Sequence, residues 1–241
     1  VDDFLSDFPA SMVTPHVPTC LQFLLLTACT SSIASSARVK AMDSIQALVV
    51  HRTKQVVKKK LFSPIFSAAF ALSAEAADPD DEGDDAGGSD DEDGDEGDEG
   101  GGEGDGQYAD GRVCRSACVL MDCLANLIPP QHCYPLVRHG CSTAMASADP
   151  GQRKAAMCIL GSAAEGMQNH PELKDELGSW VPAVLQSACS DPVKAVRSKA
   201  VSVMDMFAEH LQPEILTHSG TVLPQLLQVS TGRAQQVLLQ L

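Results

Sequence analysis

A proline-led apolar segment recurs along the chain, and this repeat restricts the fold more than any other feature. The prolines lie near the start of each apolar run, at intervals of 46, 71, 47 and 42 residues; they are Pro18, Pro64, Pro135, Pro182 and Pro224. Proline is tolerated in the first turn of a helix, where its missing N–H group would have had no partner. The recurrence therefore predicts a repeated helix, here called helix A, and the long interval indicates an insertion in one copy.

A second helical pattern follows each A segment. Asp-Pro pairs occur at residues 78–79, 149–150 and 191–192, and each pair should end a helix because the residue before a proline is disfavoured there. An arginine then stands three residues before a small alanine, which suits a close helix crossing: Arg38 and Ala41, Arg153 and Ala156, Arg197 and Ala200. Apolar residues continue at helical spacing, so we predict a second helix, helix B. The copy near residue 112 differs, because Cys114 replaces the arginine, between Arg112 and Arg115.

The repeat length is typical of HEAT and armadillo proteins. Two helices cannot bury an apolar stripe alone, so the copies must stack. The predicted fold class is all-α, a HEAT-type α-solenoid in which antiparallel helix pairs form a right-handed superhelix, with a disordered acidic insert. We expect A helices near residues 15–29, 62–77, 131–147, 173–189 and 214–229, and B helices near 38–57, 112–128, 152–168 and 193–211. The apolar positions expected to match are Ala117, Leu120, Leu124 and Ile128; Ala156, Ile159, Ala163 and Met167; and Ala200, Val203, Phe207 and Leu211.

The acidic residues are concentrated in one stretch. Residues 78–111 hold 17 of the 32 acidic residues and 11 of the 18 glycines, with no lysine or arginine, while the other 207 residues carry 17 basic and 15 acidic residues. Carboxylates at this density repel one another and glycines raise the entropy cost of ordering, so no core can form. We therefore predict HEAT repeats over 1–77, an acidic disordered loop within a repeat over 78–111, and HEAT repeats over 112–241. Without an initial methionine, and ending within a helical pattern, the chain is expected to be a piece of a longer protein.

Three functions of the acidic insert are open from the residues alone. It can be a binding loop for a basic partner, since such charge attracts cationic surfaces at long range, or an inert solvated spacer. A calcium loop is the weakest alternative: Asp78, Asp80, Glu82 and Gly83 imitate its first half, but Ser89 stands where the bidentate glutamate should be.

A basic segment, Arg38–Lys60, precedes the insert. It contains seven basic residues against one acid, Asp43; they are Arg38, Lys40, Arg52, Lys54, Lys58, Lys59 and Lys60. Cations near a helix C-terminus are favoured by the helix dipole, which explains the cluster without a function. The alternative is that the acidic loop folds back on this segment when no partner is bound.

The residues offer no catalytic constellation and require no cofactor. Cys114, Cys118, Cys123, His132, Cys133, His139 and Cys141 superficially suggest a metal site, but three cysteines along one helix do not converge on a tetrahedral ion. The nine cysteines are more simply reduced thiols packed in a core. Trp180 is expected to pack between repeats. The longest apolar patch, Leu21–Cys29, is far shorter than the roughly 20 residues that a membrane span needs.

Four strings resemble the importin-β (karyopherin-β) family. They are Leu127–Val137 (LIPPQHCYPLV), Gln152–Gly166 (QRKAAMCILGSAAEG), Val196–Ile215 (VRSKAVSVMDMFAEHLQPEI) and Val222–Leu227 (VLPQLL). Their order is also similar: a basic B helix, an A helix, an acidic insert and then these strings. The resemblance covers nearly all of the chain outside the insert.

This resemblance implies a monomeric nuclear import receptor that moves between cytoplasm and nucleus, passing transiently through the nuclear pore. Its implied partners are basic cargo proteins, including histones and ribosomal proteins, the GTP-bound small GTPase Ran, and nucleoporins. It implies no direct nucleic-acid binding, no membrane insertion, no cofactor and no enzyme activity. Two alternatives remain open: a HEAT scaffold outside transport, and an acidic protein similar to a histone chaperone.

The resemblance also assigns residues. The arginine near the start of each B helix is a structural ladder residue that pairs with an acid or a carbonyl at the repeat turn, and it corresponds to Arg38, Arg153 and Arg197; the missing arginine at 114 puts the ladder next to the insert in doubt. The implied contact residues for Ran or basic cargo are the loop acids Asp80, Asp81, Glu82, Asp84, Asp85, Asp90, Asp91, Glu92, Asp93, Asp95, Glu96, Asp98 and Glu99.

Overall fold

The computed structural model describes residues 12, 14–75 and 109–227, and these residues form helices without any strand. None of their helices is long and apolar enough to cross a membrane. The last described residues, 219–227, are also helical. The elements in chain order are α3 (Val17–Cys29), α4 (Ser35–Lys58), α5 (Phe62–Ser73), α6 (Ala109–Leu127), α7 (Pro130–Met145), α8 (Pro150–Gly166), α9 (Pro171–Asp175), α10 (Leu177–Ser190), α11 (Lys194–His210) and the 3-10 helix η2 (Glu214–His218).

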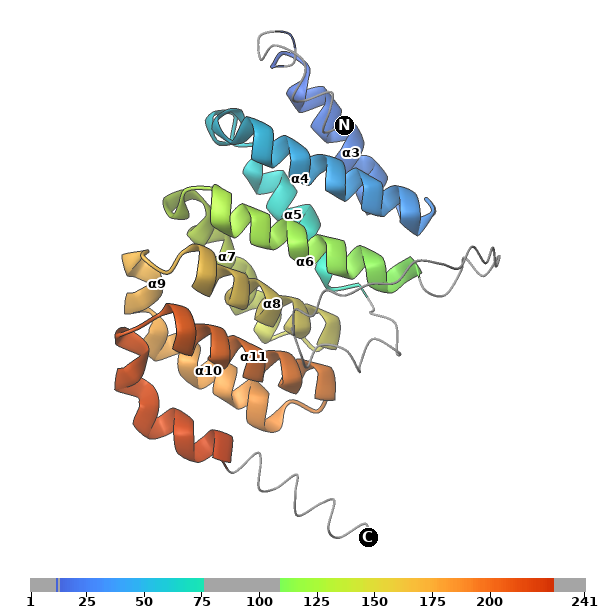
Figure 1. Ribbon diagram of the computed structural model, residues 1–241. Coiled ribbons are helices and arrows are strands. Elements are labelled where there is room, and N and C mark those ends of the chain that lie inside the picture. The colour runs from blue at the N-terminus through green and yellow to red at the C-terminus, as the bar shows by residue number, and fades with distance from the viewer. Residues whose placement is uncertain (1–11, 13, 76–108, 228–241) are drawn as a thin grey trace, which may run out of the picture.

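The helices form two layers (Figure 1). One layer contains the B helices α4, α6, α8 and α11, which pack side by side, and the other contains the A helices α3, α5, α7 and α10, which contact one another much less. The more closely spaced layer of a curved stack lies on its inner side, so the B helices line the concave face. The predicted all-α solenoid of stacked helix pairs is thus confirmed.

The core consists of the positions that the repeat pattern selects. All twelve matching apolar residues of α6, α8 and α11, with Ile128, Met167 and Leu211 just beyond the helix ends, are at most 1% exposed. The small alanines after the repeat arginines are also buried, which lets neighbouring helices approach closely. The predicted role of these positions is confirmed.

Glycines permit the closest contacts of α8 with its neighbours. A Cβ atom at Gly166 would lie 2.5 Å from the carbonyl carbon of Ala125 in α6, and one at Gly151 would meet the carbonyl oxygen of Ala74 after α5. Any side chain at these two positions would force the helices apart.

Several predicted helix limits were wrong. The expected A helix 173–189 is divided into α9 and α10, and the one expected at 214–229 begins as a 3-10 helix. Helix α4 begins at Ser35 rather than 38 and has a kink at Arg52, where φ is −131° and ψ is 29°. Helix α6 begins at Ala109, inside the segment assigned to the insert, and alanine is the strongest helix former.

The prediction that every repeat proline lies in a first turn was also wrong. Pro135 and Pro182 lie inside α7 and α10, because these helices begin earlier than the apolar runs. In α7 another proline, Pro130, occupies the first turn, where its fixed φ suits the helix. An interior proline gives up one backbone hydrogen bond, which tertiary packing must offset.

Candidate functional site

The predicted site residues divide into two groups. The acidic contact candidates between Asp80 and Glu99, and the residues of the calcium alternative, lie outside the described residues. The three repeat arginines are described, and each begins the concave layer near the start of a B helix.

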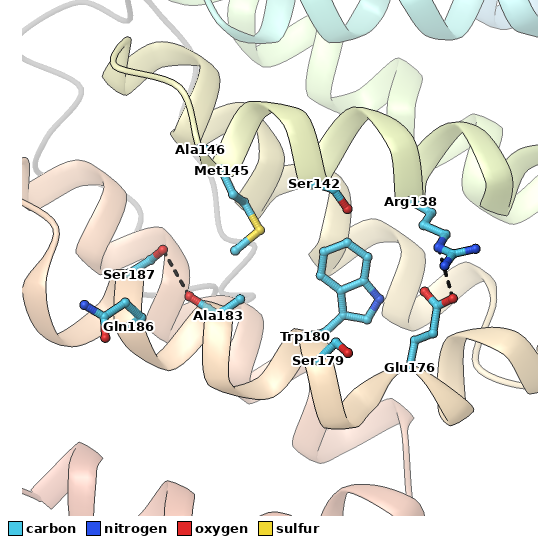
Figure 2. Close-up of a pocket in the computed structure, with 10 residues that line it drawn as sticks. All are labelled: Arg138, Ser142, Met145, Ala146, Glu176, Ser179, Trp180, Ala183, Gln186 and Ser187. Carbon is cyan, nitrogen blue, oxygen red and sulfur yellow. Dashed lines mark hydrogen bonds and ion pairs between the residues drawn. The ribbon is translucent and has the colours of Figure 1, made fainter.

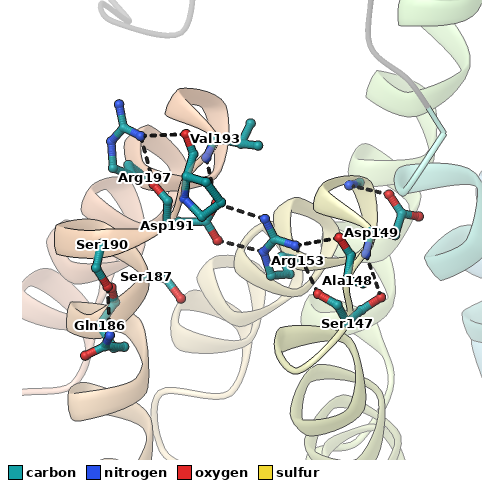
Figure 3. Close-up of polar contacts among 12 residues, drawn as sticks. Ser147, Ala148, Asp149, Arg153, Gln186, Ser187, Ser190, Asp191, Val193 and Arg197 are labelled. Atoms are coloured by element: carbon teal, nitrogen blue, oxygen red, sulfur yellow. Dashed lines mark hydrogen bonds and ion pairs between the residues drawn. The ribbon is translucent and has the colours of Figure 1, made fainter.

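Each repeat arginine donates to backbone carbonyls at the end of its own A helix, and Figure 3 shows these contacts for Arg153 and Arg197. Arg38 Nε lies 2.8 Å from the carbonyl oxygen of Ala28. Arg153 Nη1 lies 3.0 Å from those of Ser147 and Ala148, and Arg197 Nη1 lies 2.8 Å from that of Asp191 and 3.1 Å from that of Pro192. The last carbonyls of a helix have no partner within it, so the guanidinium groups satisfy them and fix the A–B turn.

Two of these arginines also reach a carboxylate of the next repeat. Arg38 Nη2 lies 2.7 Å from Glu75, which follows α5, and Arg153 binds Asp191 through two bonds of 2.7 and 3.0 Å. The bond from Arg153 is the main cause that holds the pKa of Asp191 below its usual value. These pairs therefore tie each repeat to the following one as well as to its own A helix.

At residue 114 a thiol takes the place of the guanidinium. The Cys114 side chain is 6% exposed, and its Sγ atom lies 3.1 Å from the carbonyl oxygen of Ser73 at the end of α5. The contact with the A helix is therefore kept, by a weaker and uncharged donor. This residue joins the two ends of the helix pair that the insert interrupts.

The solvent-facing side of α4, α6, α8 and α11 is here called the B face. Three of these helices present charges in the same order, with a base near the start and acids near the end. We call the first set the basic row, which consists of Arg115, Lys154 and Lys194, and the second set the acidic row, which consists of Asp122, Glu165, Asp205 and Glu209. Asp122 and Asp205 each lie eight residues after the ladder position, and Glu165 and Glu209 each lie twelve after it.

The acidic row is not explained by helix stability. Carboxylates near a helix C-terminus and cations near its N-terminus oppose the helix dipole, at about 0.3–1 kcal/mol each. Partial burial, and then the nearby charge of Glu165, raise the pKa of Asp122. The fold thus holds like charges together on the concave face, where a cationic partner would relieve the repulsion.

Sequence reasoning missed the acidic row because its residues are far apart in the chain and none belongs to a motif. The signal that could have found it is the register. Counted from the ladder positions 114, 153 and 197, the acids fall at +8 or +12, which are one helical turn apart on the same face of the helix.

The basic segment of α4 is distributed differently from the other B helices. Arg38 is 3% exposed and belongs to the ladder, whereas Lys54, Lys58, Lys59 and Lys60 are exposed at the C-terminal end. The pair with Arg38 places Glu75, the last described residue before the insert, near the start of α4 and about 30 Å from Lys58 at 1.5 Å per residue. Lysines at this end suit the helix dipole.

Cysteines of the rejected metal alternative lie largely in the core. Cys114, Cys123, Cys133 and Cys141 are buried free thiols. Within residues 12, 14–75 and 109–227, no three His, Cys, Asp or Glu side chains are placed to bind a metal ion.

Two curated proteins resemble the chain in sequence. Importin-4 of Mus musculus is 29% identical over 221 residues, which are 90% of this chain and 19% of importin-4. Importin-4 of Homo sapiens is 28% identical over 231 residues, 93% of this chain and 20% of that protein. The chain thus spans about a fifth of the length of these relatives. No protein-family model matches it.

Solved structures of the karyopherin Kap121p share the fold. Kap121p bound to RanGTP superposes with a TM-score of 0.71 at 17% identity, over 90% of this chain and 20% of that chain. Kap121p bound to Pho4p gives a TM-score of 0.70 at 18% identity, over 89% and 20%. These relatives are transport receptors and not enzymes, in agreement with the non-enzymatic expectation. In sequence the chain is thus similar to importin-4, and in fold it is similar to the karyopherin Kap121p.

Proposed function

We propose that the chain is a segment of a nuclear import receptor and that its B face binds basic segments of cargo proteins. The observation that carries this proposal is the acidic row, whose residues lie eight or twelve positions after the ladder residue on the concave face of three consecutive B helices, one helical turn apart, and oppose the helix dipoles. Binding is by charge complementarity, and no covalent step is involved.

The spacing of the row suggests the form of the cargo. Packed helices lie about 8–10 Å apart, and an extended chain advances about 3.3 Å per residue. A cargo segment that crosses the B helices would therefore meet an acidic residue with about every third side chain. Lysine or arginine at that interval would fit the row best, and the proposed cargo comprises basic proteins such as histones and ribosomal proteins.

The loop acids between Asp80 and Glu99 supply the long-range part of the same proposal. Their charge would attract cationic cargo before it reaches the B face, raising the association rate more than the final affinity. We extend the proposal to GTP-bound Ran, since Kap121p is known with RanGTP, and to nucleoporins. The corresponding location is the cytoplasm and the nucleus, with transient passage through the nuclear pore.

The direct test uses the whole chain and a fluorescent peptide with lysine at every third position. A triple variant of the row, Asp122→Asn with Glu165→Gln and Asp205→Asn, should weaken binding roughly tenfold or more, since solvent-exposed ion pairs contribute up to about 1 kcal/mol each. The control removes two exposed acids that lie off the B face, with Glu172→Gln and Asp175→Asn. If the control lost as much affinity as the triple variant, the overall charge of the chain rather than the acidic row would explain the binding.

Two further assays separate the alternatives. Capture of GTP-loaded Ran by the full-length parent protein is expected for a transport receptor and not for another HEAT scaffold. Histone binding by an isolated 78–111 peptide, with the affinity of the whole chain, would instead favour the histone-chaperone alternative.

A further inference from the structure

Cysteine thiols from three helices gather at the contact between α6 and α8. Cys118 of α6 hydrogen-bonds with Cys114, one turn before it, and with Cys158 of α8; these two contacts, followed by burial, raise the pKa of Cys118. Burial, and then the nearby Cys158, also raise the pKa of Cys141 in α7. Metal binding does not account for the gathering, because no metal site is found among the described residues.

Two of these four thiols are directed at backbone carbonyls. Cys114 Sγ lies 3.1 Å from a carbonyl oxygen of α5, and Cys141 Sγ lies 3.5 Å from one of α8. Both side chains are buried, whereas Cys118 and Cys158 are only half-buried. Cys118 and Cys158 are therefore the two thiols that meet between helices and that a small oxidant in the solvent can reach.

The register of the two helices places Cys118 and Cys158 at the same level. Helices α6 and α8 run in the same direction in the B layer (Figure 1). A Cβ atom at Gly166 of α8 would lie 2.8 Å from the backbone nitrogen of Asn126 in α6, so these two positions are level with each other. Cys158 and Cys118 each lie eight residues before them, about 12 Å back along both helices. The proximity of the thiols thus follows from the backbone packing.

This pair of thiols is not repeated along the B layer. The two cysteines lie four and five residues after the ladder position of their helices, where α11 has Val201 and Ser202 and α4 has Met42 and Asp43. Neither α4 nor α11 contains a cysteine. Of the contacts among α4, α6, α8 and α11, the one between α6 and α8 is therefore the only one with cysteines on both sides.

Contacts in the A layer are more open. Between α7 and α10 a groove of about 610 Å³ remains, lined by small side chains that include Ser142 and Ala183 (Figure 2). Trp180 crosses this contact, and its indole Nε1 donates to the hydroxyl oxygen of Tyr134 at 3.1 Å, in agreement with the packing role predicted for Trp180. A disulfide requires two Cβ atoms about 3.5–4.5 Å apart, so it suits the close B layer rather than the A layer.

We propose that Cys118 and Cys158 are a redox-active pair and that hydrogen peroxide converts them into a disulfide that joins α6 to α8. One thiolate attacks a peroxide oxygen, which forms a sulfenic acid on that cysteine and releases the other oxygen as water. The second thiol then attacks the sulfenic sulfur, so that the S–S bond forms and the hydroxyl leaves with the thiol proton as a second water. The two sulfurs together lose two electrons, and these reduce one hydrogen peroxide to two waters.

The two thiols have different roles in this reaction. The raised pKa of Cys118 keeps that thiol protonated at neutral pH, which suits the second step. Cys158 has Lys154 one turn before it in α8, and a neighbouring cation favours a thiolate. We therefore assign the attack on peroxide to Cys158.

The direct test oxidises the whole chain with hydrogen peroxide at low protein concentration, blocks the remaining thiols and maps the tryptic peptides. Peptide 155–174 contains Cys158 as its only cysteine, and peptide 116–138 contains Cys118 and two others. The two peptides should be recovered as one species that is two hydrogens lighter than their sum and separates when a reductant is added. Fragmentation should place the bond at Cys118.

Two variants locate the bond. Cys118→Ala should abolish the linked species, whereas Cys123→Ala, which removes a thiol from the same helix and the same peptide, should keep it. Circular dichroism of the reduced chains confirms that both variants are folded. Linkage of Cys158 to Cys114 or to any other cysteine would overturn the proposal, as would recovery of Cys158 in the wild type only as a free thiol or a sulfinic acid.

A second measurement asks whether the bond fits the folded structure. Trp180 is the single tryptophan, so its fluorescence reports urea unfolding of the whole chain before and after oxidation. The disulfide should raise the urea midpoint, because it restricts the unfolded chain between residues 118 and 158. The gain should disappear with reductant and be absent from Cys118→Ala. A midpoint that is equal or lower in the oxidised wild type would show that the bond forms only by distorting the α6–α8 contact, and would overturn the proposal.

Discussion

Single residues tie the repeats together, and Arg153 does so most completely. Its side chain is 12% exposed and that of Asp191 is 5% exposed, so the pair is largely removed from water. Arg153→Met would leave the carboxylate buried without its partner and two carbonyls unsatisfied, lowering the free energy of unfolding by about 3 kcal/mol. Arg197→Met, which breaks hydrogen bonds to carbonyls but none to a carboxylate, should cost about 1 kcal/mol. Urea unfolding compares them, and similar losses would contradict a special role for the buried pair.

The same pair predicts a pH dependence. Its hydrogen bonds lower the pKa of Asp191 in the folded chain, mainly through Arg153. The stability that results is complete above the unfolded pKa of about 3.9 and is lost as the pH falls through the folded value. The difference in unfolding free energy between the wild type and Arg153→Met should therefore shrink between about pH 5 and about pH 2. If the difference in unfolding free energy stayed constant over this range, packing rather than charge would account for the stabilising effect of Arg153.

The ladder could be anticipated from the sequence at this scale because its signal is local. An arginine three residues before a small alanine recurs at the same point of each repeat. The carboxylates Glu75 and Asp191 could not be identified as its partners, because each lies about 37 or 38 residues further along and is brought near only by stacking. The acidic row was missed for the same reason.

At the scale of the elements, the contact between α6 and α8 brings the carboxylates of Asp122 and Glu165 close together, and their repulsion destabilises the unbound protein. Burial, and then Glu165, raise the pKa of Asp122. An acid with a raised folded pKa lowers stability while it is ionised, and the penalty disappears when the pH falls far enough to protonate it. Asp122→Asn should therefore raise the midpoint temperature of thermal unfolding at pH 7, while it weakens the binding of basic peptides. A lower midpoint would show that the carboxylate stabilises the seam.

The other constraint on this seam is steric. In Gly166→Ala the new Cβ atom would meet the backbone of Ala125, so α6 and α8 must separate, at about 1–3 kcal/mol. Gly178→Ala is the matched control, because nothing lies within 4 Å of that position in α10 and alanine is the better helix former by about 0.5–1 kcal/mol. The two substitutions should thus shift the urea midpoint in opposite directions. A neutral Gly166→Ala would contradict the close approach.

Element limits were less predictable than element types. The apolar period identified each helix, but the starts of α7 and α10 depend on residues before the apolar run, such as Pro130. The kink of α4 at Arg52 could not be predicted, because no proline or glycine lies in that helix. Helix limits and kinks of this kind depend on packing between repeats, so the sequence of one repeat does not predict them.

At the scale of the whole molecule, the acidic insert determines the net charge of the chain. Deleting residues 80–105 removes 15 acidic residues and would bring the formal charge from −15 to zero. The shorter connection changes the free energy of loop closure by only about 1 kcal/mol, so the repeats should stay folded. Affinity for a lysine-rich peptide should fall and become less sensitive to salt, as measured by titration at several salt concentrations. An unchanged affinity and salt dependence would remove the insert from cargo binding.

The thiol at residue 114 has a consequence for the part of the chain next to the insert. A guanidinium there would be attracted to the seventeen carboxylates that precede it in sequence, and it could exchange the carbonyl of Ser73 for them. The uncharged thiol of Cys114 is not attracted to these carboxylates in the same way, so its bond to Ser73 does not compete with them. The hydrogen bond from Cys114 to Ser73, which connects α6 to the end of α5, should therefore depend little on ionic strength or on a partner bound to the acidic insert. The repeats can thus carry a highly charged insert without a change in their packing.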